Sequence, residues 1–504
     1  MRPLSKFKSR FTLILLALLG ILILLVLAVL MNTARQVSKQ TKAQAVAPIS
    51  IDENGVLNNL SQSIQFATVS SAEDANLNAE EFRRLHQLFR RAFPNVYQRA
   101  HEEIIGNLSI LLTIPGTQAD AQPILLLAHQ DVVPIAPGTE AAWTYPPFSG
   151  AIKDQFVWGR GAWDNKSNLM AQLEALELLL KSGFQNQRTI YLAFGADEEV
   201  QGLRGAAQIA SMLKQRQIRL HSVLDEGLLI THGMLPGLDA PAALIGVAEK
   251  GYLSVEITVK AVPGHSSMPP NPGQSAIAKL GKVISYIDQH PRPLQIAGVA
   301  RELFNTVGPE MQGLNKYALT NLWLLRPVVE AQLRSSDASR ALLQSTTALT
   351  IVQAGNKENV LPGQAQAIVN YRLLPGDSSS AVVADLKTAI GTLLSEAEFS
   401  VRALPNAVEA SRISSHRSLP YQILQQSIKD IFPEVVTAPG LMLGATDSIK
   451  FEELSDHIYK FSPVHANDRD LQRFHGTDER VSVSNYLDMI RFYYLYLSRA
   501  SRLE

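Results

Sequence analysis

A histidine and several acids recur between residues 124 and 199, and each stands where an apolar run of the chain ends. Open α/β sheets place their sites where strands end, so we expect these side chains to meet at one edge of a sheet. Imidazole and carboxylate groups together can bind divalent metal ions and transfer protons. The stretch therefore predicts most of a two-metal hydrolytic centre. Its side chains are His129, Asp131, Asp164, Glu198 and Glu199.

Taken singly, each of these residues also has a structural interpretation. His129 and Asp131 can form a hydrogen-bonded pair. Asp164 can form an Asx turn or the N-cap of a helix that begins near Lys166 and includes the expected helical run Asn168–Leu180. The adjacent glutamates would suit the first turn of a helix, where acids interact favourably with the helix dipole. Further along the chain, an aspartate in SVLDEG and a histidine in FHGTDER would each suit a turn.

The ordered set is more informative than its members. With Asp225 of SVLDEG and His475 of FHGTDER, the chain offers enough histidines and acids at separate loop ends for two metal ions that share one carboxylate. Such a pair of ions needs a nearby acid outside the ligand set to take the proton of a water molecule. The doublet Glu198-Glu199 can supply both a ligand and this base.

Several motifs follow one another along the chain: H-x-D, G-R-G-x-x-D-x-K, D-E-E, D-E-G, P-G-H-S-S and F-H-G. In this order they resemble the di-zinc peptidase family that includes carboxypeptidase G, aminoacylase, carnosinase and succinyl-diaminopimelate desuccinylase. HQDVVP, PPFSG and WGRGAWDNK are similar to the branch of carboxypeptidase S and the N-fatty-acyl-amino-acid hydrolases. The resemblance extends from about Leu60 to the C-terminus and implies two Zn²⁺ ions per subunit.

The resemblance also implies a role for each side chain. Asp164 would be the ligand that bridges the two ions, and a cis peptide bond would follow it. Glu198 would be the general base, and Asp131 would orient His129. His265 of PGHSS would stabilise the oxyanion, from the same chain or from a partner subunit. The remaining ligands would be His129 and Asp225 for one ion, and Glu199 and His475 for the other.

Three further residues are candidates for contact with the substrate. Asn359 lies in GNKENVLPG, which resembles the family's asparagine-containing lid motif. Lys450 lies in LGATDSIKF, where the family often has an arginine, and a lysine lacks the bidentate fork of a guanidinium. Arg372 is a second candidate to bind a substrate carboxylate. Structural salt bridges are the alternative role for both cations.

Alternating strand and helix patterns predict an α/β fold with a mixed sheet flanked by helices. The pattern changes after Lys250, where Tyr252–Val259 alternates like a half-exposed strand. We expect a smaller α+β lid or dimerisation domain to be inserted here, with an irregular stretch up to about Thr346. The expected boundaries are 52–250 and 406–504 for the two parts of the catalytic domain and 251–405 for the insertion.

Residues 11–31 form an uncharged run rich in Leu, Ile and Val, close to the ~20 residues that cross a bilayer as a helix. A basic leader at residues 1–10 favours a cytoplasmic N-terminus, with the catalytic part on the non-cytoplasmic side. We favour a single-pass signal anchor followed by a linker at residues 32–51. The alternatives are a cleaved signal peptide, which would leave the protein secreted, and a buried core helix, which the lack of polar positions disfavours.

Composition excludes some classes of function. The chain has 504 residues, 46% of them hydrophobic, which predicts two globular domains plus extra segments. Lysine plus arginine and aspartate plus glutamate number 46 each, so no net charge points to nucleic acid. Cysteine is absent, which excludes disulfides, thiolate ligands and a cysteine nucleophile.

These observations predict a zinc-dependent hydrolase that cleaves the amide bond of N-acyl amino acids or small peptides with a free C-terminal carboxylate. The alternatives are an aminopeptidase or deacetylase of the same family, or an inactive relative that serves as a membrane-tethered binding module. The expected partners are a small-molecule substrate, the membrane through the N-terminal helix, and a second copy of the chain through the lid domain.

Overall fold

The computed structural model describes residues 4–503, and the side chains of residues 12–503. Residues 1–3 of the expected basic leader lie outside the described residues, as do the side chains of the rest of that leader.

An eight-stranded mixed sheet forms the centre of the larger domain, as the sequence predicts. The strands β3 and β6 are buried along their whole length, which explains why they read as continuous apolar runs. Strand β3 runs parallel to β6 on one side and to β7 on the other, so these three strands end at the same edge. In spatial order the sheet contains β1 (His101–Ile105), β2 (Ser109–Ile114), β6 (Ile190–Gly195), β3 (Ile124–His129), β7 (Ser222–Thr231), β16 (Ile458–Ala466), β8 (Ala242–Glu249) and β15 (Val436–Met442).

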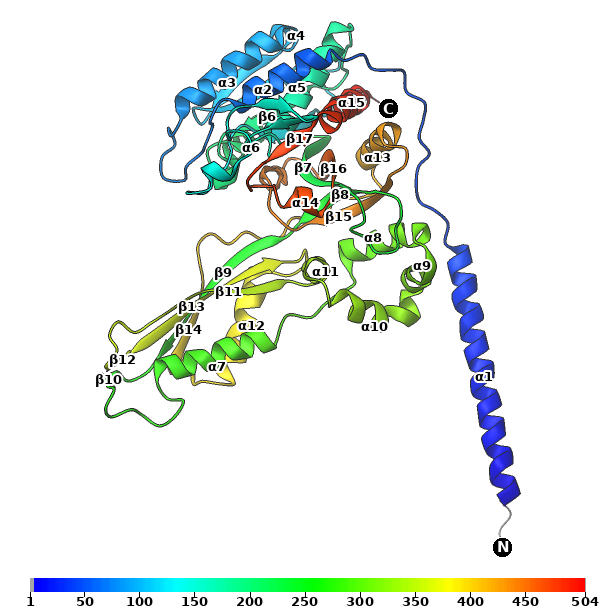
Figure 1. Cartoon of the computed structure of the whole chain (residues 1–504), viewed down its shortest axis with the longest axis vertical. Coiled ribbons are helices and arrows are strands. Elements are labelled where there is room, and N and C mark those ends of the chain that lie inside the picture. The colour runs from blue at the N-terminus through cyan, green and yellow to red at the C-terminus, as the bar shows by residue number, and fades with distance from the viewer. Residues whose placement is uncertain (1–3, 504) are drawn as a thin grey trace.

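Helices cover both faces of this sheet (Figure 1). Alternate residues of β3 belong to two different cores: Leu126 packs on one face, and Leu125 and Leu127 on the other. The first face is covered by α2 (Glu53–Ile64), α3 (Ala79–Ala92), α5 (Lys166–Lys181), α13 (Leu419–Ile431) and α15 (Val483–Ala500). The second face is covered by α6 (Ala206–Gln215).

A second, smaller sheet has its own core and extends away from the first (Figure 1). We call it the small unit, residues 251–290 and 346–403. Its antiparallel strands lie in the order β11 (Thr346–Ala354), β13 (Gln364–Leu373), β9 (Gly251–Lys260) and β14 (Phe399–Ala403). The helices α7 (Ala276–Gln289) and α12 (Ser379–Gly391) pack on it. A two-stranded ribbon of β10 (Gly264–His265) and β12 (Val360–Leu361) lies at its far tip (Figure 1).

The stretch that precedes Thr346, expected to be irregular, is helical. In α8 (Gly298–Val307) the residues Val299, Leu303, Phe304 and Val307 follow helical spacing and are buried. They join a core with β8 and β15 of the larger domain, not with the small unit. The segment continues through α9 (Gly313–Thr320), α10 (Leu322–Leu333) and α11 (Asp337–Leu343).

The first helix, α1 (Leu4–Arg35), projects from the rest of the molecule (Figure 1). Its segment Thr12–Arg35 is 24 residues long and apolar enough to cross a membrane, and it is not buried in the protein. This excludes the core-helix alternative, whereas a signal sequence would pass the same test of length and composition. From Gln36 to Asp52 the chain has no regular secondary structure.

Candidate active site

The carboxylate of Asp164 lies between two imidazoles. Its Oδ1 is 2.9 Å from Nε2 of His129, and its Oδ2 is 2.7 Å from Nε2 of His475. His129 is the last residue of β3, whereas Asp164 lies in the loop before α5 and His475 in the loop before β17 (Arg480–Ser482). The end of β3 and two loops from distant parts of the chain thus converge, and each oxygen of one carboxylate faces a different histidine.

Two glutamates complete the two groups. Glu226 Oε1 is 3.1 Å from His129 Nε2, and Glu199 Oε2 is 3.4 Å from His475 Nε2. Glu199 follows β6 and Glu226 lies within β7. Both strands are neighbours of β3, and their register brings the two acids to the end of β3 that carries His129. In each group, His129–Asp164–Glu226 and Asp164–Glu199–His475, the candidate ligand atoms lie within 4.8 Å of one another.

Asp225, expected beside His129, is not part of either group. Its two carboxylate oxygens accept backbone N–H groups, from Glu226 at 2.9 Å and from Ser448 at 2.9 Å. Successive residues of a strand point to opposite faces, so only one of the two acids in DEG can face the histidine. The doublet was visible in the sequence, but the orientation of β7 that selects Glu226 was not.

Asp131 contacts both His129 and the acidic doublet. Its Oδ1 lies 3.4 Å from Nδ1 of His129. The same nitrogen lies 2.9 Å from the backbone carbonyl oxygen of Asp131. Its two oxygens also accept the backbone N–H groups of Glu198, at 3.2 Å, and Glu199, at 3.1 Å. One buried carboxylate thus positions a histidine on one strand end and the acidic doublet on the next.

The acids of the site are enclosed, and this changes their protonation. Burial raises the pKa of Glu198 well above its usual value, against the lowering effect of His129, and the nearby acid Asp447 adds to the rise. Burial also raises the pKa of Glu226 to about 7. Hydrogen bonds with Asp164 and Glu199 raise the pKa of His475 to about 10. A raised pKa suits Glu198 to a residue that takes up and returns a proton.

The donor set fits divalent metal ions. The groups contain only imidazole nitrogens and carboxylate oxygens, which suits zinc in a chain without cysteine. Glu199 Oε1 is buried and has no hydrogen-bond partner, an arrangement that costs free energy unless a cation satisfies it. The peptide bond Asp164–Asn165 is cis, in agreement with the resemblance, and Asn165 Nδ2 donates a hydrogen bond to Glu226.

A buried pair that the sequence analysis missed holds two of the loops together. Glu479 Oε2 accepts a hydrogen bond from Arg160 at 2.5 Å, and Arg160 also donates to the His475 carbonyl at 3.1 Å. Glu479 Oε1 accepts three backbone N–H groups of the loop that carries Asp164, from Gly161, Trp163 and Asp164, at 2.9–3.0 Å. Glu479 stands four residues after His475 in FHGTDER. The motif therefore contains it, but the sequence does not indicate that it binds the loop of Asp164.

His265 and Asn359 lie together, but away from this centre. His265 belongs to β10 and Asn359 directly precedes β12, in the ribbon region at the tip of the small unit (Figure 1). There Ser266 N donates a hydrogen bond to the Asn359 carbonyl at 3.1 Å. His265 is exposed, and its Nδ1 is 2.8 Å from Ser267 Oγ. Within the described residues neither side chain makes a hydrogen bond or ion pair with the metal groups. Their expected roles therefore require movement of the small unit or a second copy of the chain.

Arg372 and Lys450 line one cavity with Glu198. This cavity has a volume of about 300 Å³ and also contains Lys250 and Tyr252 in its wall. The Arg372 guanidinium lies 4.9 Å from the centre of the Tyr252 ring. Three cationic side chains next to a candidate base suit a substrate that carries a carboxylate near its reacting bond.

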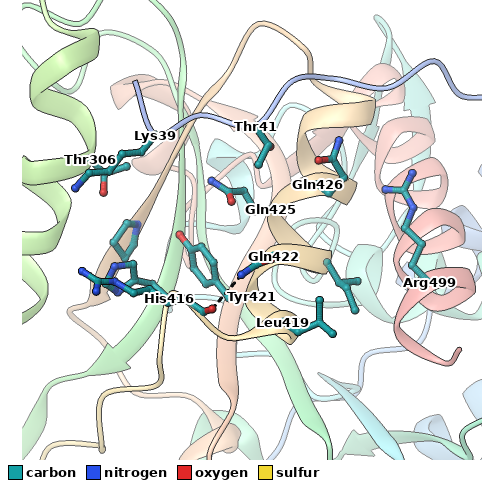
Figure 2. Close-up of a pocket in the computed structure, with 13 residues that line it drawn as sticks. Lys39, Thr41, Thr306, His416, Leu419, Tyr421, Gln422, Gln425, Gln426 and Arg499 are labelled. Atoms are coloured by element: carbon teal, nitrogen blue, oxygen red, sulfur yellow. Dashed lines mark hydrogen bonds between the residues drawn. The ribbon is translucent and has the colours of Figure 1, made fainter. Parts of the chain in front are cut away.

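A larger cavity of about 700 Å³ lies elsewhere, between residues 36–44 and α13 (Figure 2). Lys39 and Thr41 face Gln425 and Gln426 across it, and Arg499 of α15 closes one side (Figure 2). No candidate ligand or base of the metal centre lines this cavity. Size alone therefore does not mark the active site in this molecule.

Residues 125–499 match the peptidase family M20/M25/M40. The chain is 36% identical over 496 residues to "Probable carboxypeptidase S-like 2" of Dictyostelium discoideum, which covers 96% of this chain and 94% of the relative. It is 38% identical over 446 residues to N-fatty-acyl-amino acid synthase/hydrolase PM20D1.1 of Danio rerio, and 30% identical over 490 residues to carboxypeptidase S of Saccharomyces cerevisiae. The match to the Danio rerio protein covers 87% of this chain and 84% of the relative. The match to the Saccharomyces cerevisiae protein covers 88% of this chain and 84% of the relative.

Solved structures share the fold at lower identity. The M20 family metallo-carboxypeptidase Sso-CP2 of Sulfolobus solfataricus superposes with a TM-score of 0.61 and 18% identity, over 90% of this chain and all of that one. Human carnosine dipeptidase 1 gives a TM-score of 0.60 and 15% identity, over 90% and 97% of the two chains.

Proposed function

Since the chain belongs to peptidase family M20/M25/M40, we propose that it is a two-zinc hydrolase of N-acyl amino acids or small peptides with a free C-terminal carboxylate. Family membership makes it a metal-dependent hydrolase of amide bonds, and its relatives include proteins named carboxypeptidase S and N-fatty-acyl-amino acid synthase/hydrolase. The observation that carries the proposal is the Asp164 carboxylate between two imidazoles, with Glu198 beside a cationic cavity.

Each metal ion would have three protein ligands. His129, Asp164 and Glu226 would hold one Zn²⁺, and Asp164, Glu199 and His475 the other. When bound, the ions would polarise the amide carbonyl and lower the pKa of a water molecule, as in other two-metal sites. Glu226 takes the place that the resemblance suggested for Asp225.

Glu198 would transfer the proton. Its backbone N–H is held by Asp131, so its position is coupled to that of His129, which the same acid orients. Glu198 would accept a proton from the attacking water and deliver it to the nitrogen of the leaving amine. Burial raises the pKa of Glu198, which favours the protonated form that returns the proton.

The cavity beside Glu198 would select the substrate. Arg372 and Lys450 place positive charge where a substrate carboxylate would lie if its amide bond were next to Glu198. His265 and Asn359 would reach the oxyanion and the substrate after closure of the small unit, or from a second copy in a homodimer. The small unit would thus serve as a lid or dimerisation domain.

The N-terminal helix would be a signal anchor that leaves the catalytic part on the non-cytoplasmic side. The length and exposure of Thr12–Arg35 support this proposal. Carbonate extraction of washed membranes tests it: the anchored protein stays in the pellet, whereas a cleaved, secreted form appears in the supernatant.

A substrate panel with a matched inactive variant tests the hydrolase proposal. Metal-reconstituted protein is assayed on N-acyl amino acids and dipeptides, each with a free and with an amidated C-terminus. We expect hydrolysis of the free acids only, and Glu198→Gln should lose turnover yet retain both metals. Equal rates on amidated substrates would instead indicate an aminopeptidase or deacetylase, and protein that binds no zinc would indicate a binding relative.

A further inference from the structure

The helical hairpin α9–α10 carries an apolar face that no other part of the described chain covers. On α10 the exposed residues Trp323, Leu324, Pro327, Val328 and Ala331 follow the spacing of one helix face. Trp323 is 61% exposed and Val328 63% exposed. On α9, Leu314 is 85% exposed, and Tyr317 is exposed one turn further along.

The opposite face of α10 is packed inside the protein. Val329 is buried, and Leu322 and Leu333 pack against the same core next to β15. The helix is therefore apolar on two opposite faces, of which only one has protein against it, and Arg326, Glu330 and Gln332 lie between these faces. An exposed apolar face of this kind, bordered by polar residues, is typical of a surface that binds a partner or a membrane.

The hairpin is bonded to the C-terminal end of α1. Asn32 Nδ2 donates to the Thr320 carbonyl at 2.7 Å and to Asn321 Oδ1 at 3.0 Å. Asn321 Nδ2 donates to Thr33 Oγ1 at 2.9 Å, and this contact is buried. Asn321 is the residue that joins α9 to α10, and its Oδ1 also accepts the Trp323 Nε1–H at 3.1 Å. One polar network thus connects the end of the apolar span to the exposed tryptophan.

The segment after the span is also attached to the larger domain. We call residues 36–44 the strap. Gln40 exchanges hydrogen bonds with the backbone of Thr437 in β15, at 2.8 and 2.9 Å. Gln44 N donates to Asp430 Oδ1 of α13 at 2.7 Å, and Figure 2 shows Thr41 of the strap lying over this helix. These two attachments hold α1 in a defined position relative to the catalytic domain, so the strap is not a loose tether.

This position brings α10 beside the span. In Figure 1, α9 adjoins the C-terminal end of α1, and α10 lies on the side of the hairpin toward which the N-terminus of α1 extends. A membrane that α1 crosses would therefore lie on the same side of the protein as α10. From Gly313 to Arg334 the chain has three basic residues, Lys316, Arg326 and Arg334, and one acid, Glu330.

We propose that the exposed face of α9–α10 binds the lipid bilayer that α1 spans, as an interfacial membrane contact for anionic phospholipid. This proposal rests on the signal anchor of the proposed function. Tryptophan and tyrosine favour the membrane interface, apolar side chains enter the acyl boundary, and the basic residues would meet the headgroups. The contact would hold the catalytic domain against the membrane, where acylated substrates partition.

The absence of cysteine allows a direct test with single spin labels on the full chain. Val328→Cys, Leu22→Cys in α1, and Leu203→Cys are each labelled and reconstituted in phosphatidylcholine vesicles with and without phosphatidylglycerol. Leu203 is the matched control, since it is 58% exposed and precedes α6. Depth is read from relaxation by oxygen and by a water-soluble nickel complex. We expect the Val328 label about 5–10 Å below the headgroups, and the Leu203 label in water.

Each outcome decides a separate question. If the Leu22 label lies in the bilayer but the Val328 label matches Leu203, the membrane contact is refuted while the anchor stands. If the Leu22 label is in water, both the anchor and the contact are refuted. Dipolar broadening between Val328 labels that persists on dilution in lipid would show that a second copy covers this face. None of these readings depends on turnover, so the hydrolase proposal is judged separately by its own assay.

Intrinsic fluorescence gives a second readout without a label. The chain has four tryptophans, and Trp143, Trp158 and Trp163 are buried, which leaves Trp323 as the exposed one. Phospholipids brominated on the upper acyl chain should quench part of the emission of the native protein, and this part should disappear in Trp323→Phe. Equal quenching of the two proteins would contradict the proposal.

Discussion

Glu479 accepts the backbone N–H of Asp164 at 3.0 Å, although the two residues stand 315 positions apart in the chain. The same carboxylate is paired with Arg160, and Arg160 contacts the backbone of His475. A buried acid that touches no candidate metal ligand side chain therefore sets the positions of two of them. Groups of this kind orient ligands and raise the affinity of a site for its metal.

The first prediction concerns this positioning residue. Glu479→Gln keeps one oxygen for the loop N–H groups but loses the charge opposite Arg160, so we expect metal affinity and turnover to fall about 10–100-fold. Metal titration and kcat/KM measure the effect, and added zinc should restore part of the activity. Glu249→Gln is the control, because Glu249 is another buried acid with a lysine partner but does not contact the Asp164 loop. Equal losses in the two variants would mean that Glu479 has only a structural role.

The second prediction separates the two acids of DEG. Glu226→Ala should remove one of the two metal ions, because Glu226 lies beside His129. Asp225→Asn should keep both ions, since its carboxylate is occupied by backbone N–H groups, although it should lower the melting temperature. Metal content per chain and thermal unfolding measure the two effects independently. The opposite pattern of metal loss would restore Asp225 as the ligand.

The third prediction is a pH effect on stability. Burial raises the pKa of Glu174 to about 7, above 4.5 in the unfolded chain. Below pH 4.5 both states hold the proton, whereas between pH 4.5 and 7 only the folded state does, so stability falls as pH rises through this window and stays lower above it. The loss is about 3 kcal/mol at most, at 1.36 kcal/mol per pKa unit.

A conservative variant tests this directly. Glu174→Gln keeps the oxygen that accepts the hydrogen bond of Asn59 at 2.8 Å, but it cannot ionise. Its melting temperature should exceed that of the native protein at pH 8 and match it more closely at pH 5. Glu80→Gln, on an exposed helix surface, should show no such difference between the two values of pH. A constant offset at both pH values would contradict the assignment to Glu174.

The fourth prediction concerns the substrate carboxylate. Arg372→Gln should raise KM for free-acid substrates about 10–100-fold, the equivalent of losing a charged hydrogen bond of 1.5–3 kcal/mol, with little change in kcat. Arg372→Lys should recover part of the affinity, because it keeps the charge without the fork. The ring contact with Tyr252 would be lost in the first variant as well, so Tyr252→Leu is the matched control. An unchanged KM for Arg372→Gln would show that this residue does not contact the carboxylate.

The chemistry of the site could be predicted from residue types and order alone. The strand ends next to His129 and Glu199 were identifiable because apolar runs end there, and Asp164 because it stands in a glycine-containing loop before a helix. The α/β class follows from alternating strands and helices. The boundaries of α5 and β9 lie within two residues of the expected ones. The sequence of β9 alternates between apolar and polar residues, and the C-cap of α5 is Ser182, next to Gly183 with its positive φ. The helices at residues 298–343 were missed, although buried apolar residues follow helical spacing in α8.

Residue types and their spacing along the chain thus determined the kind of chemistry, the family and the apolar N-terminal helix. Only the tertiary structure decided that Glu226 and not Asp225 faces His129, because successive side chains of β7 point to opposite faces of the sheet. It also decided that Glu479 holds the Asp164 loop and that α10 keeps an uncovered apolar face beside α1. These relationships join residues hundreds of positions apart, and spacing along the chain carries no information about such contacts until the sheet and its helices place them together.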